Sequence, residues 1–407
     1  MARVLQRNER EKGKRKKVGL PHFCLLTFLL FTFLGCESSN KANKTKPALA
    51  EKAGDWGPIL SPDLLDHAGL QTTWDQKLPL KEGEKFASVL LLGDRLYLRS
   101  DRNYLWSLDR VTGNVVFSRS LAATGIPVLG LATYENTLIS VIGNQLVELD
   151  INTGTEQRVS DLDLSIVAPP ARNNRFFYIG AADRRLHVFR ADDLVQTFPV
   201  TADDNSLITT ILADDSLVAF GTDAGDLVGM APDAPTKRWQ FKATGVPNAK
   251  VRVGVPLAAV AGSIIRDGAS FYFASTDTQV YRIDVAENTG ATMIWKHQTE
   301  AVLDRSPRVT RDFVYQYAPG RGLTALAKQS GQAAWSLPEG VDLLAEAGTK
   351  AYVITKTHTL AVMDNTAGKK LLSVNFAPVT DHAANRTDAR IYLVDGVGRV
   401  TCLEPTK

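Results

Sequence analysis

The sequence predicts an all-β fold, an eight-bladed β-propeller in which eight four-stranded sheets stand around a common axis. Three observations predict it. A short phrase of alternating apolar residues occurs eight times at intervals near 40 residues, a turn usually built on glycine follows it, and the last copy lacks a strand that a segment near the start of the body can supply. The 30 Gly, 18 Pro and 16 Phe agree with strands and turns and argue against an all-α bundle.

The chain begins with the layout of a secretory signal peptide. Residues 1–35 carry eight basic side chains, all before the apolar run 23–34, and this order is typical of an export signal. The run is shorter than the roughly 20 residues that a membrane-spanning helix needs. It ends in Phe33-Leu34-Gly35-Cys36, which resembles the lipobox of bacterial lipoproteins, so Cys36 is the predicted lipid attachment site. An uncleaved anchor, or a simple secretory signal with a chance cysteine, is the alternative.

Residues 36–56 are predicted to be a flexible tether, because the stretch 37–47 is polar and has no aromatic residue. The propeller then spans residues 57–407. Outside residues 1–35 the chain has 39 basic and 42 acidic side chains, a formal charge of about −3, which excludes a nucleic-acid partner by charge. Each methylene group of a lipid chain that enters the membrane contributes about 0.8 kcal/mol of binding free energy, so the lipid would hold the protein at a membrane surface.

Cysteine usage agrees with this organisation. Cys24 leaves with the signal and Cys36 takes the lipid, so no intrachain disulfide is possible in the body. The remaining Cys402 stands in an apolar segment and is predicted to be a small buried hydrophobic residue.

The repeated phrase defines the blades. Its eight copies end at Asp109, Asp150, Arg190, Ala231, Asp284, Ala327, Asp364 and Glu404. Successive ends lie 41, 40, 41, 53, 43, 37 and 40 residues apart, which matches the roughly 40 to 45 residues of a propeller blade. Glycines expected at positive φ follow five copies: Gly113, Gly154, Gly290, Gly331 and Gly368. A bulky residue then falls on the predicted outermost strand, where it can fill the wedge between blades: Phe117, Phe198, Trp239, Trp295, Trp335 and Leu372.

The eighth copy stops at Glu404, before any outermost strand. The segment 72–76 has the composition of the missing strand, so we expect it to complete the eighth blade and close the ring. Seven blades with a stray eighth pair of strands is the competing count.

No motif in the chain predicts catalysis. The nucleophile elbow, the phosphate-binding loop and the dinucleotide fingerprint are absent, and the six histidines are scattered without metal-ligand spacing. Acidic residues recur at one position of the repeat, which argues for hydrogen bonding in turns: Asp109, Asp150, Asp284 and Asp364. We therefore predict no enzyme activity, no catalytic residue, no metal and no cofactor.

The phrase from Leu326 to Trp335 resembles the tryptophan-docking repeat of pyrroloquinoline-quinone-type propellers. Together with the lipobox, the repeat over roughly residues 70–405 resembles the BamB family of outer-membrane protein assembly lipoproteins. This resemblance implies a non-enzymatic scaffold that faces the periplasm and binds the β-barrel assembly machinery or another envelope protein. It implies the outer membrane, although the acidic Glu37 leaves the inner membrane open. The segment 201–206 has no clear counterpart of the family's docking loop.

Two other function classes stay open. Quinoprotein oxidoreductases share this repeat but hold their quinone beside a disulfide between adjacent cysteines, and this chain has no adjacent cysteines, so no bound quinone or calcium is expected. A lineage-specific propeller that binds another surface molecule is the second alternative, since propellers carry many functions.

Two segments are candidates for a docking face. The basic residues Arg305, Arg308 and Arg311, near Asp304, would suit an acidic partner or anionic headgroups. The extra residues of the 53-residue step, within 245–265, are predicted to project as a loop or a strand extension. Ordinary loop variation and a solvated charged surface are the alternatives.

Overall fold

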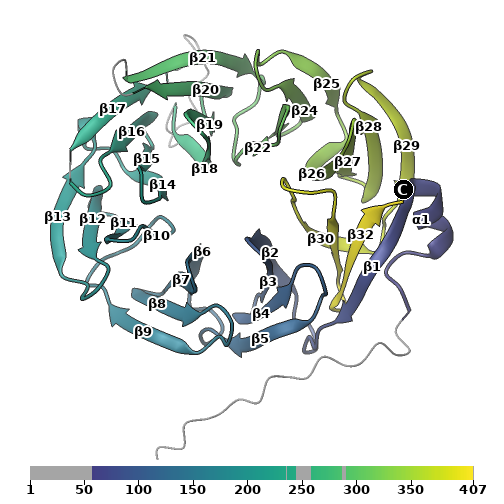
Figure 1. Cartoon of the computed structure of the whole chain (residues 1–407), viewed down its shortest axis with the longest axis horizontal. Coiled ribbons are helices and arrows are strands. Elements are labelled where there is room, and N and C mark those ends of the chain that lie inside the picture. Colours follow the sequence, from purple (N-terminus) through teal and green to yellow (C-terminus); the bar gives the residue numbers. More distant parts are fainter. Residues whose placement is uncertain (1–56, 235, 244–257, 287–289, 407) are drawn as a thin grey trace, which may run out of the picture. The chain divides into compact units, whose positions relative to one another are not determined.

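The computed structural model describes residues 57–234, 236–243, 258–286 and 290–406. These residues form eight four-stranded antiparallel sheets around one axis (Figure 1). We call the sheets blades 1 to 8 and their strands A to D, from the innermost to the outermost. The predicted eight-bladed propeller is confirmed, and the count of seven blades is wrong.

Blades 1 to 4 each use four consecutive strands. They are β2 (Phe86–Leu92), β3 (Arg95–Ser100), β4 (Tyr104–Asp109), β5 (Val115–Ser120); β6 (Val128–Tyr134), β7 (Thr137–Ile142), β8 (Gln145–Asp150), β9 (Glu156–Asp161); β10 (Ala171–Arg172), β11 (Phe176–Gly180), β12 (Arg185–Arg190), β13 (Gln196–Thr201); and β14 (Ile208–Ala213), β15 (Val218–Thr222), β16 (Asp226–Met230), β17 (Lys237–Lys242). A short 3-10 helix, η1 (Asp203–Asn205), connects blades 3 and 4.

Blades 5 to 7 follow the same order, and blade 8 combines both ends of the described chain. The strands are β18 (Val260–Asp267), β19 (Ser270–Ser275), β20 (Gln279–Ala286), β21 (Gly290–Gln298); β22 (Arg308–Val309), β23 (Phe313–Ala318), β24 (Gly322–Ala327), β25 (Ala333–Leu337); β26 (Gly340–Ala347), β27 (Lys350–Thr355), β28 (Thr359–Asp364), β29 (Lys369–Asn375); and β30 (Val379–Ala383), β31 (Ile391–Asp395), β32 (Arg399–Pro405), β1 (Leu70–Lys77).

The N-terminal strand β1 closes the ring as strand D of blade 8. It pairs antiparallel with β32, and Trp74 lies opposite Cys402 in the register. Backbone hydrogen bonds continue the pairing at both ends, from Leu78 N–H to the Gly398 oxygen at 2.8 Å and from Thr406 N–H to the Gly69 oxygen at 2.9 Å. The expected strand near Trp74 is confirmed. Because β1 completes the last sheet, blade 8 is a full four-stranded blade that packs against blade 7 on one side and blade 1 on the other.

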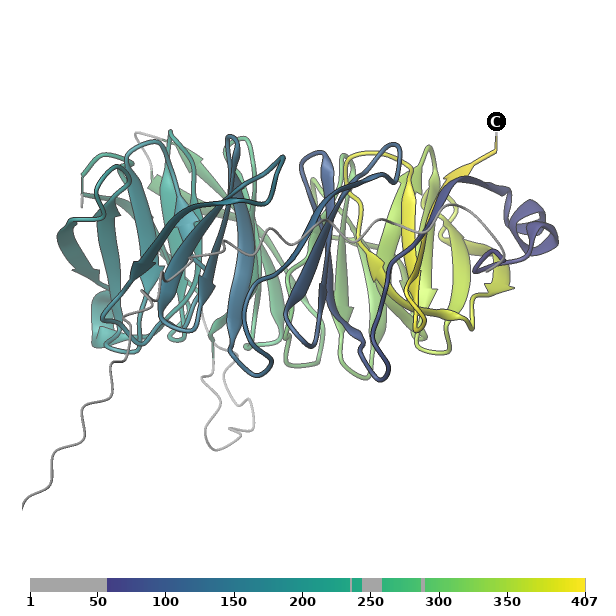
Figure 2. The ribbon, with the colours of Figure 1, turned by 90° about the horizontal axis from the view of Figure 1, so that it is seen from below.

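The turns of the ring gather at two faces (Figure 2). The A–B and C–D turns share one face, which we call the A–B face. In blade 1 the backbone N–H of Arg110 in the C–D turn donates to the oxygen of Asp94 in the A–B turn at 3.2 Å, and Lys328 and Asp312 repeat this bond in blade 6 at 2.9 Å. The B–C turns and the connections between blades lie on the opposite face, the D–A face.

Aromatic side chains of the outermost strands dock on the glycine turn of the next blade. A Cβ at Gly331 would lie 2.5 Å from the ring of Trp295, and one at Gly113 would lie 2.5 Å from the ring of Trp74. Both glycines have positive φ, 69° and 72°. The turn needs this backbone conformation and the neighbouring ring needs the missing Cβ, so glycine meets both requirements.

Three of the recurring aspartates form hydrogen bonds within the turns, as predicted. Asp109 Oδ1 accepts hydrogen bonds from the backbone N–H of Val111 and Thr112 at 3.0 and 2.8 Å, and Asp150 and Asp364 make the same pair of bonds. Among the described residues, Asp284 accepts hydrogen bonds from the side chains of Ser270 and Arg282.

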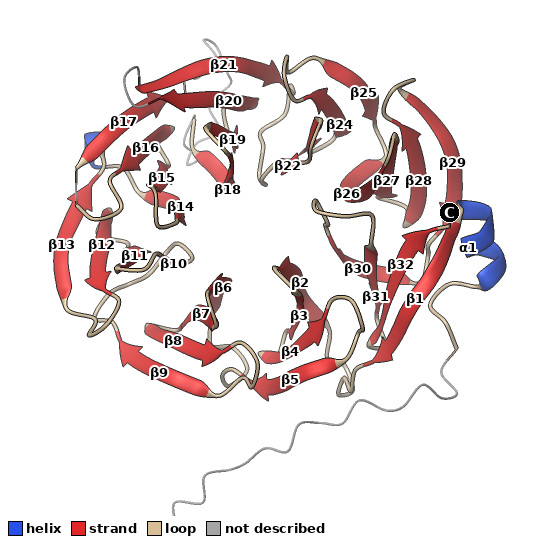
Figure 3. Ribbon diagram, viewed as in Figure 1, coloured by secondary structure: helices blue, strands red, loops and turns tan. Residues whose placement is uncertain are grey.

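The sequence interpretation did not anticipate the helix α1 (Pro62–Ala68), which lies at the outer edge of the ring beside β1 (Figure 3). Its signals are present, because Ser61 caps the first turn, a proline follows and Gly69 ends the helix at φ 64°. Leu65 and Ala68 join a buried cluster with strands of blades 7 and 8. In the described residues, no helix is long and apolar enough to cross a membrane.

Candidate interaction surface around the ring axis

The structure spreads the predicted interaction residues over both faces of the ring. Asp304 and Arg305 lie in the D–A connection before blade 6, Arg308 begins the innermost strand β22, and Arg311 lies in the A–B turn that follows. The four residues therefore do not form one patch.

Arg305 and Asp304 form an exposed pair on the D–A face. Arg305 Nε lies 3.3 Å from Asp304 Oδ1, and the guanidinium stands 4.2 Å from the ring centroid of Tyr317. An exposed ion pair of this kind contributes little to stability, about 0–1 kcal/mol. Both groups thus remain accessible at the surface.

Arg308 already has a carboxylate partner within the ring. Its Nε and Nη2 donate to the two oxygens of Asp342 in β26 at 2.9 and 2.7 Å. His382 Nε2 in β30 lies 3.2 Å from Asp342 Oδ2. Three neighbouring blades thereby share one carboxylate through their innermost strands.

The charge state of Asp342 follows from this geometry. Burial alone would raise the pKa of Asp342, but the hydrogen bonds from His382 and Arg308 outweigh it and hold the pKa well below its usual range. The Asp342 side chain is 9% exposed, so the carboxylate is an ionised group that links blades 6, 7 and 8.

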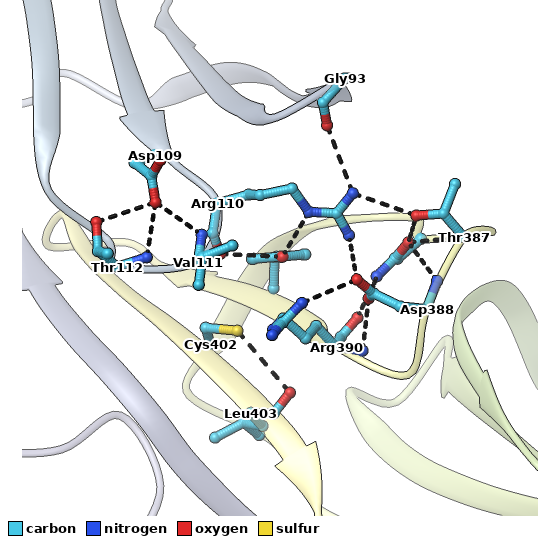
Figure 4. A network of polar contacts seen from close by, with 12 residues as sticks. Gly93, Asp109, Arg110, Val111, Thr112, Thr387, Asp388, Arg390, Cys402 and Leu403 are labelled. Atoms are coloured by element: carbon cyan, nitrogen blue, oxygen red, sulfur yellow. Dashed lines mark hydrogen bonds and ion pairs between the residues drawn. The ribbon is translucent and has the colours of Figure 1, made fainter.

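The A–B loop of blade 8, residues 384–390, is fixed by Arg110 from blade 1 (Figure 4). The Arg110 guanidinium donates to Thr387 Oγ1 at 3.2 Å, to Asp388 Oδ2 at 2.8 Å and to the Tyr392 hydroxyl at 3.2 Å. The Tyr392 hydroxyl donates back to the Arg110 backbone oxygen at 3.1 Å. One buried arginine thus joins the first blade to the last.

Asn385 shapes the same loop from inside. Its backbone N–H donates to the Leu344 oxygen at 2.9 Å, and its side chain donates to the Arg390 oxygen at 2.9 Å and accepts from the Thr387 N–H at 3.1 Å. Asn385 is fully buried. The neighbouring Arg386 is consequently presented by a rigid loop.

Sequence reasoning missed Arg386 and two further cations that the A–B face brings near Arg311. Arg266 of blade 5 pairs with Asp214 and donates to Ser216 Oγ at 2.9 Å. Lys328 of blade 6 pairs with Asp267. The signal for Arg386 in the sequence is the length of the seven-residue connection between β30 and β31.

Several sequence predictions lie beyond the described residues. Cys36 and the tether 36–56 are outside them, as are residues 244–257 of the long step, whereas residues 260–265 belong to the innermost strand β18. Among the described residues, no three His, Cys, Asp or Glu side chains gather as a metal site requires.

Known structures share this architecture. BamB from Moraxella catarrhalis is similar with a TM-score of 0.61 and 15% identity, covering 82% of this chain and 97% of that one. The computationally designed protein Ika8 matches with a TM-score of 0.59 and 14% identity over 79% of this chain and 96% of that one. Quinohemoprotein alcohol dehydrogenase from Comamonas testosteroni matches with a TM-score of 0.59 and 13% identity, over 85% of this chain and 78% of that one. At such identities the likeness concerns the fold.

None of the curated proteins matches this sequence. A family model, in contrast, does match it. The family model described as outer membrane protein assembly factor BamB matches residues 64–337. This match covers more than half of the chain and includes most of helix α1, strand β1 and blades 1 to 6, and so the chain belongs to the BamB family.

Proposed function

We propose that this protein is a non-enzymatic scaffold in the assembly of outer-membrane β-barrel proteins. The observation that carries the proposal is the family match over residues 64–337, on a ring that its own N-terminal strand closes. A closed ring holds its loops at fixed positions on two faces, which suits a surface that docks partners.

The proposal includes the route by which the protein reaches its place. Residues 1–35 act as a lipoprotein signal, Cys36 takes the lipid, residues 36–56 form the tether and residues 57–407 the propeller. The anchor holds the ring at the outer membrane, where it faces the periplasm. The basic-then-apolar order of the first 34 residues and the Gly35-Cys36 pair support this part.

Crosslinking in intact cells tests the scaffold role. A tagged full-length chain is crosslinked, purified under denaturing conditions and its partners are identified by mass spectrometry. We expect the membrane-embedded β-barrel subunit of the assembly machinery or a protein bound to it. Recovery of soluble enzymes alone, with no envelope protein, contradicts the proposal.

Substitution of the lipidation site tests the anchor. Cells that express Cys36→Ser are labelled with radioactive palmitate and their inner and outer membranes are separated. The unaltered chain should carry label and follow the outer membrane, whereas Cys36→Ser should carry none. Label that persists in the variant, or a labelled chain in the inner membrane, contradicts this part.

A second function, that of a quinoprotein oxidoreductase, is favoured by the structural likeness to quinohemoprotein alcohol dehydrogenase. The absorbance spectrum and calcium content of protein purified from its native envelope distinguish the two. A quinone band with stoichiometric calcium supports the oxidoreductase, and partner capture without that band supports the scaffold.

A further inference from the structure

Two adjoining cavities on the A–B face share Arg386 and Arg266. One, of about 410 Å³, is lined by these arginines with Leu212 and Asp214 of blade 4. The other, of about 550 Å³, is lined by the same arginines with Arg311 and Lys328 of blade 6. We call the two together the axial recess. Arg386 of blade 8 thus meets residues of blades 4, 5 and 6 around one hollow.

The axial recess has more positive than negative charge. Its cations are Arg266, Arg311, Lys328 and Arg386, and its anions are Asp214 and Asp267. Both anions are already paired, Asp214 with Arg266 and Asp267 with Lys328. Within the described part of the chain, Arg311 and Arg386 have no ion-pair partner. Two positive charges therefore stay uncompensated.

Arg386 is exposed and stands close to other positive charge. Partial burial by the surrounding protein lowers the pKa of Arg386 below its ordinary value, and the nearby Arg308 lowers it further. The buried Asn385 and the bonds from Arg110 fix the loop backbone that carries Arg386.

Two of the other cations are held in position by hydrogen bonds and ion pairs. Lys328 Nζ donates to the backbone oxygens of Thr310 and Arg311 at 2.8 and 3.3 Å. Arg266 is held by Asp214 and Ser216. Because Lys328 and Arg266 are already ordered, these two side chains lose little conformational entropy when a ligand arrives.

The size and lining indicate the class of ligand. The volume of each cavity is more than ten times the ~30 Å³ that one water molecule occupies in the liquid. Each cavity is therefore much larger than a single carboxylate or phosphate group. Leu212, Ile264 and Ile265 give one cavity an apolar side. An extended peptide that alternates acidic and apolar side chains matches both features, because neighbouring side chains in an extended chain point to opposite sides.

We propose that the axial recess binds an acidic peptide segment of a partner protein, with Arg386 and Arg311 pairing with its carboxylates. This inference rests on the proposed scaffold function and specifies the chemistry of one partner contact. A protein segment is preferred over a membrane surface because the chain outside residues 1–35 carries a formal charge of about −3, which opposes long-range attraction to anionic headgroups.

Fluorescence anisotropy tests the inference on the whole chain. The probe is a fluorescein-labelled peptide about ten residues long with glutamate and leucine alternating, and the same peptide with glutamine is its control. We expect the glutamate peptide to bind, with an affinity that falls as the salt concentration rises, and the glutamine peptide not to bind. Arg386→Ala and Arg311→Ala should each weaken it by about fivefold.

Arg175→Ala provides the matched control variant. Arg175 lies in the A–B turn of blade 3, on the same face and exposed, but does not line the recess. Its substitution should leave the affinity within about twofold. Circular dichroism melts of all variants establish that each one is folded.

Each other outcome overturns the assignment. Equal affinity in the double variant Arg386→Ala/Arg311→Ala excludes the recess as the site. Equal binding of inorganic phosphate identifies a small-anion site, and arginine-dependent binding of anionic phospholipid vesicles without peptide binding identifies a membrane contact. The proposed scaffold function is tested independently of the recess, because it is contradicted only if the unaltered chain captures no envelope protein in the crosslinking experiment.

Discussion

The indole N–H of Trp74 donates a hydrogen bond to the backbone oxygen of Arg110 at 3.2 Å, which joins the N-terminal strand to the C–D turn of blade 1. The same ring covers Gly113 and packs 6.1 Å from the Tyr392 ring, measured between centroids. Trp74 therefore contacts the first blade and the last at once. A ring that closes at this point unfolds as a unit, because loss of the strand exposes both neighbours.

Trp74→Ala should lower the free energy of unfolding by about 3–5 kcal/mol, since Trp74 is 8% exposed and its removal leaves a cavity at the closure. Urea unfolding followed by circular dichroism measures it. Leu371→Ala is the control, because Leu371 is 52% exposed on the outermost strand of blade 7. A loss no greater than that of the control contradicts the closure role.

Gly331→Ala and Gly348→Ala together separate docking from backbone strain. Both glycines have positive φ, 69° and 58°, so each substitution costs about 1–2 kcal/mol of backbone energy. Only at Gly331 would the new Cβ meet a neighbour, the Trp295 ring at 2.5 Å, whereas at Gly348 nothing lies within 4 Å. Overpacking against the Trp295 ring should therefore lower the free energy of unfolding of Gly331→Ala by a further amount of about 1–3 kcal/mol. Equal midpoints of thermal unfolding for the two variants contradict docking.

The fold was predictable because its rules are local and repeat. Each blade needs an alternating strand, a turn and a bulky residue at a set spacing, and eight copies make weak signals add up. Where a turn departs from the pattern, another residue meets the same backbone requirement: in blade 3, Leu194 adopts φ 57° at the turn. That substitution hides the glycine signal without changing the topology.

The axial contacts were not predictable from spacing. Arg308, Asp342 and His382 lie on separate blades, and their meeting depends on how three innermost strands face the axis. Arg305 and Arg311 are six residues apart but lie on opposite faces, because the short strand β22 runs between them. Charge along the sequence therefore marks basic residues as candidates, but it does not predict which of them share a surface.

Asp342→Asn should destabilise the ring by about 3–5 kcal/mol near neutral pH, since it leaves Arg308 without its carboxylate. The native pKa of Asp342 is depressed, so the carboxylate contributes stability above its ordinary pKa and loses it as the pH falls through the native value. The difference between the two proteins should therefore shrink below about pH 4. Urea midpoints at neutral and acidic pH measure it, and a difference that stays constant or grows on acidification contradicts the role of the ionised group.

Cys402 should resist alkylation in the folded protein and react on unfolding. It is fully buried opposite Trp74, and burial raises the pKa of its thiol to about 12, so the reactive thiolate is rare in the folded protein at pH 8. Iodoacetamide labelling with mass spectrometry of the peptide that contains Cys402 measures the rate. Trp74→Ala should accelerate labelling, because opening of the closing strand then exposes the sulfur more often. A native rate equal to the rate in urea would mean that the two ends of the chain do not stay paired, whereas a rate that rises only with denaturant or with Trp74→Ala ties the thiol's protection to closure of the ring.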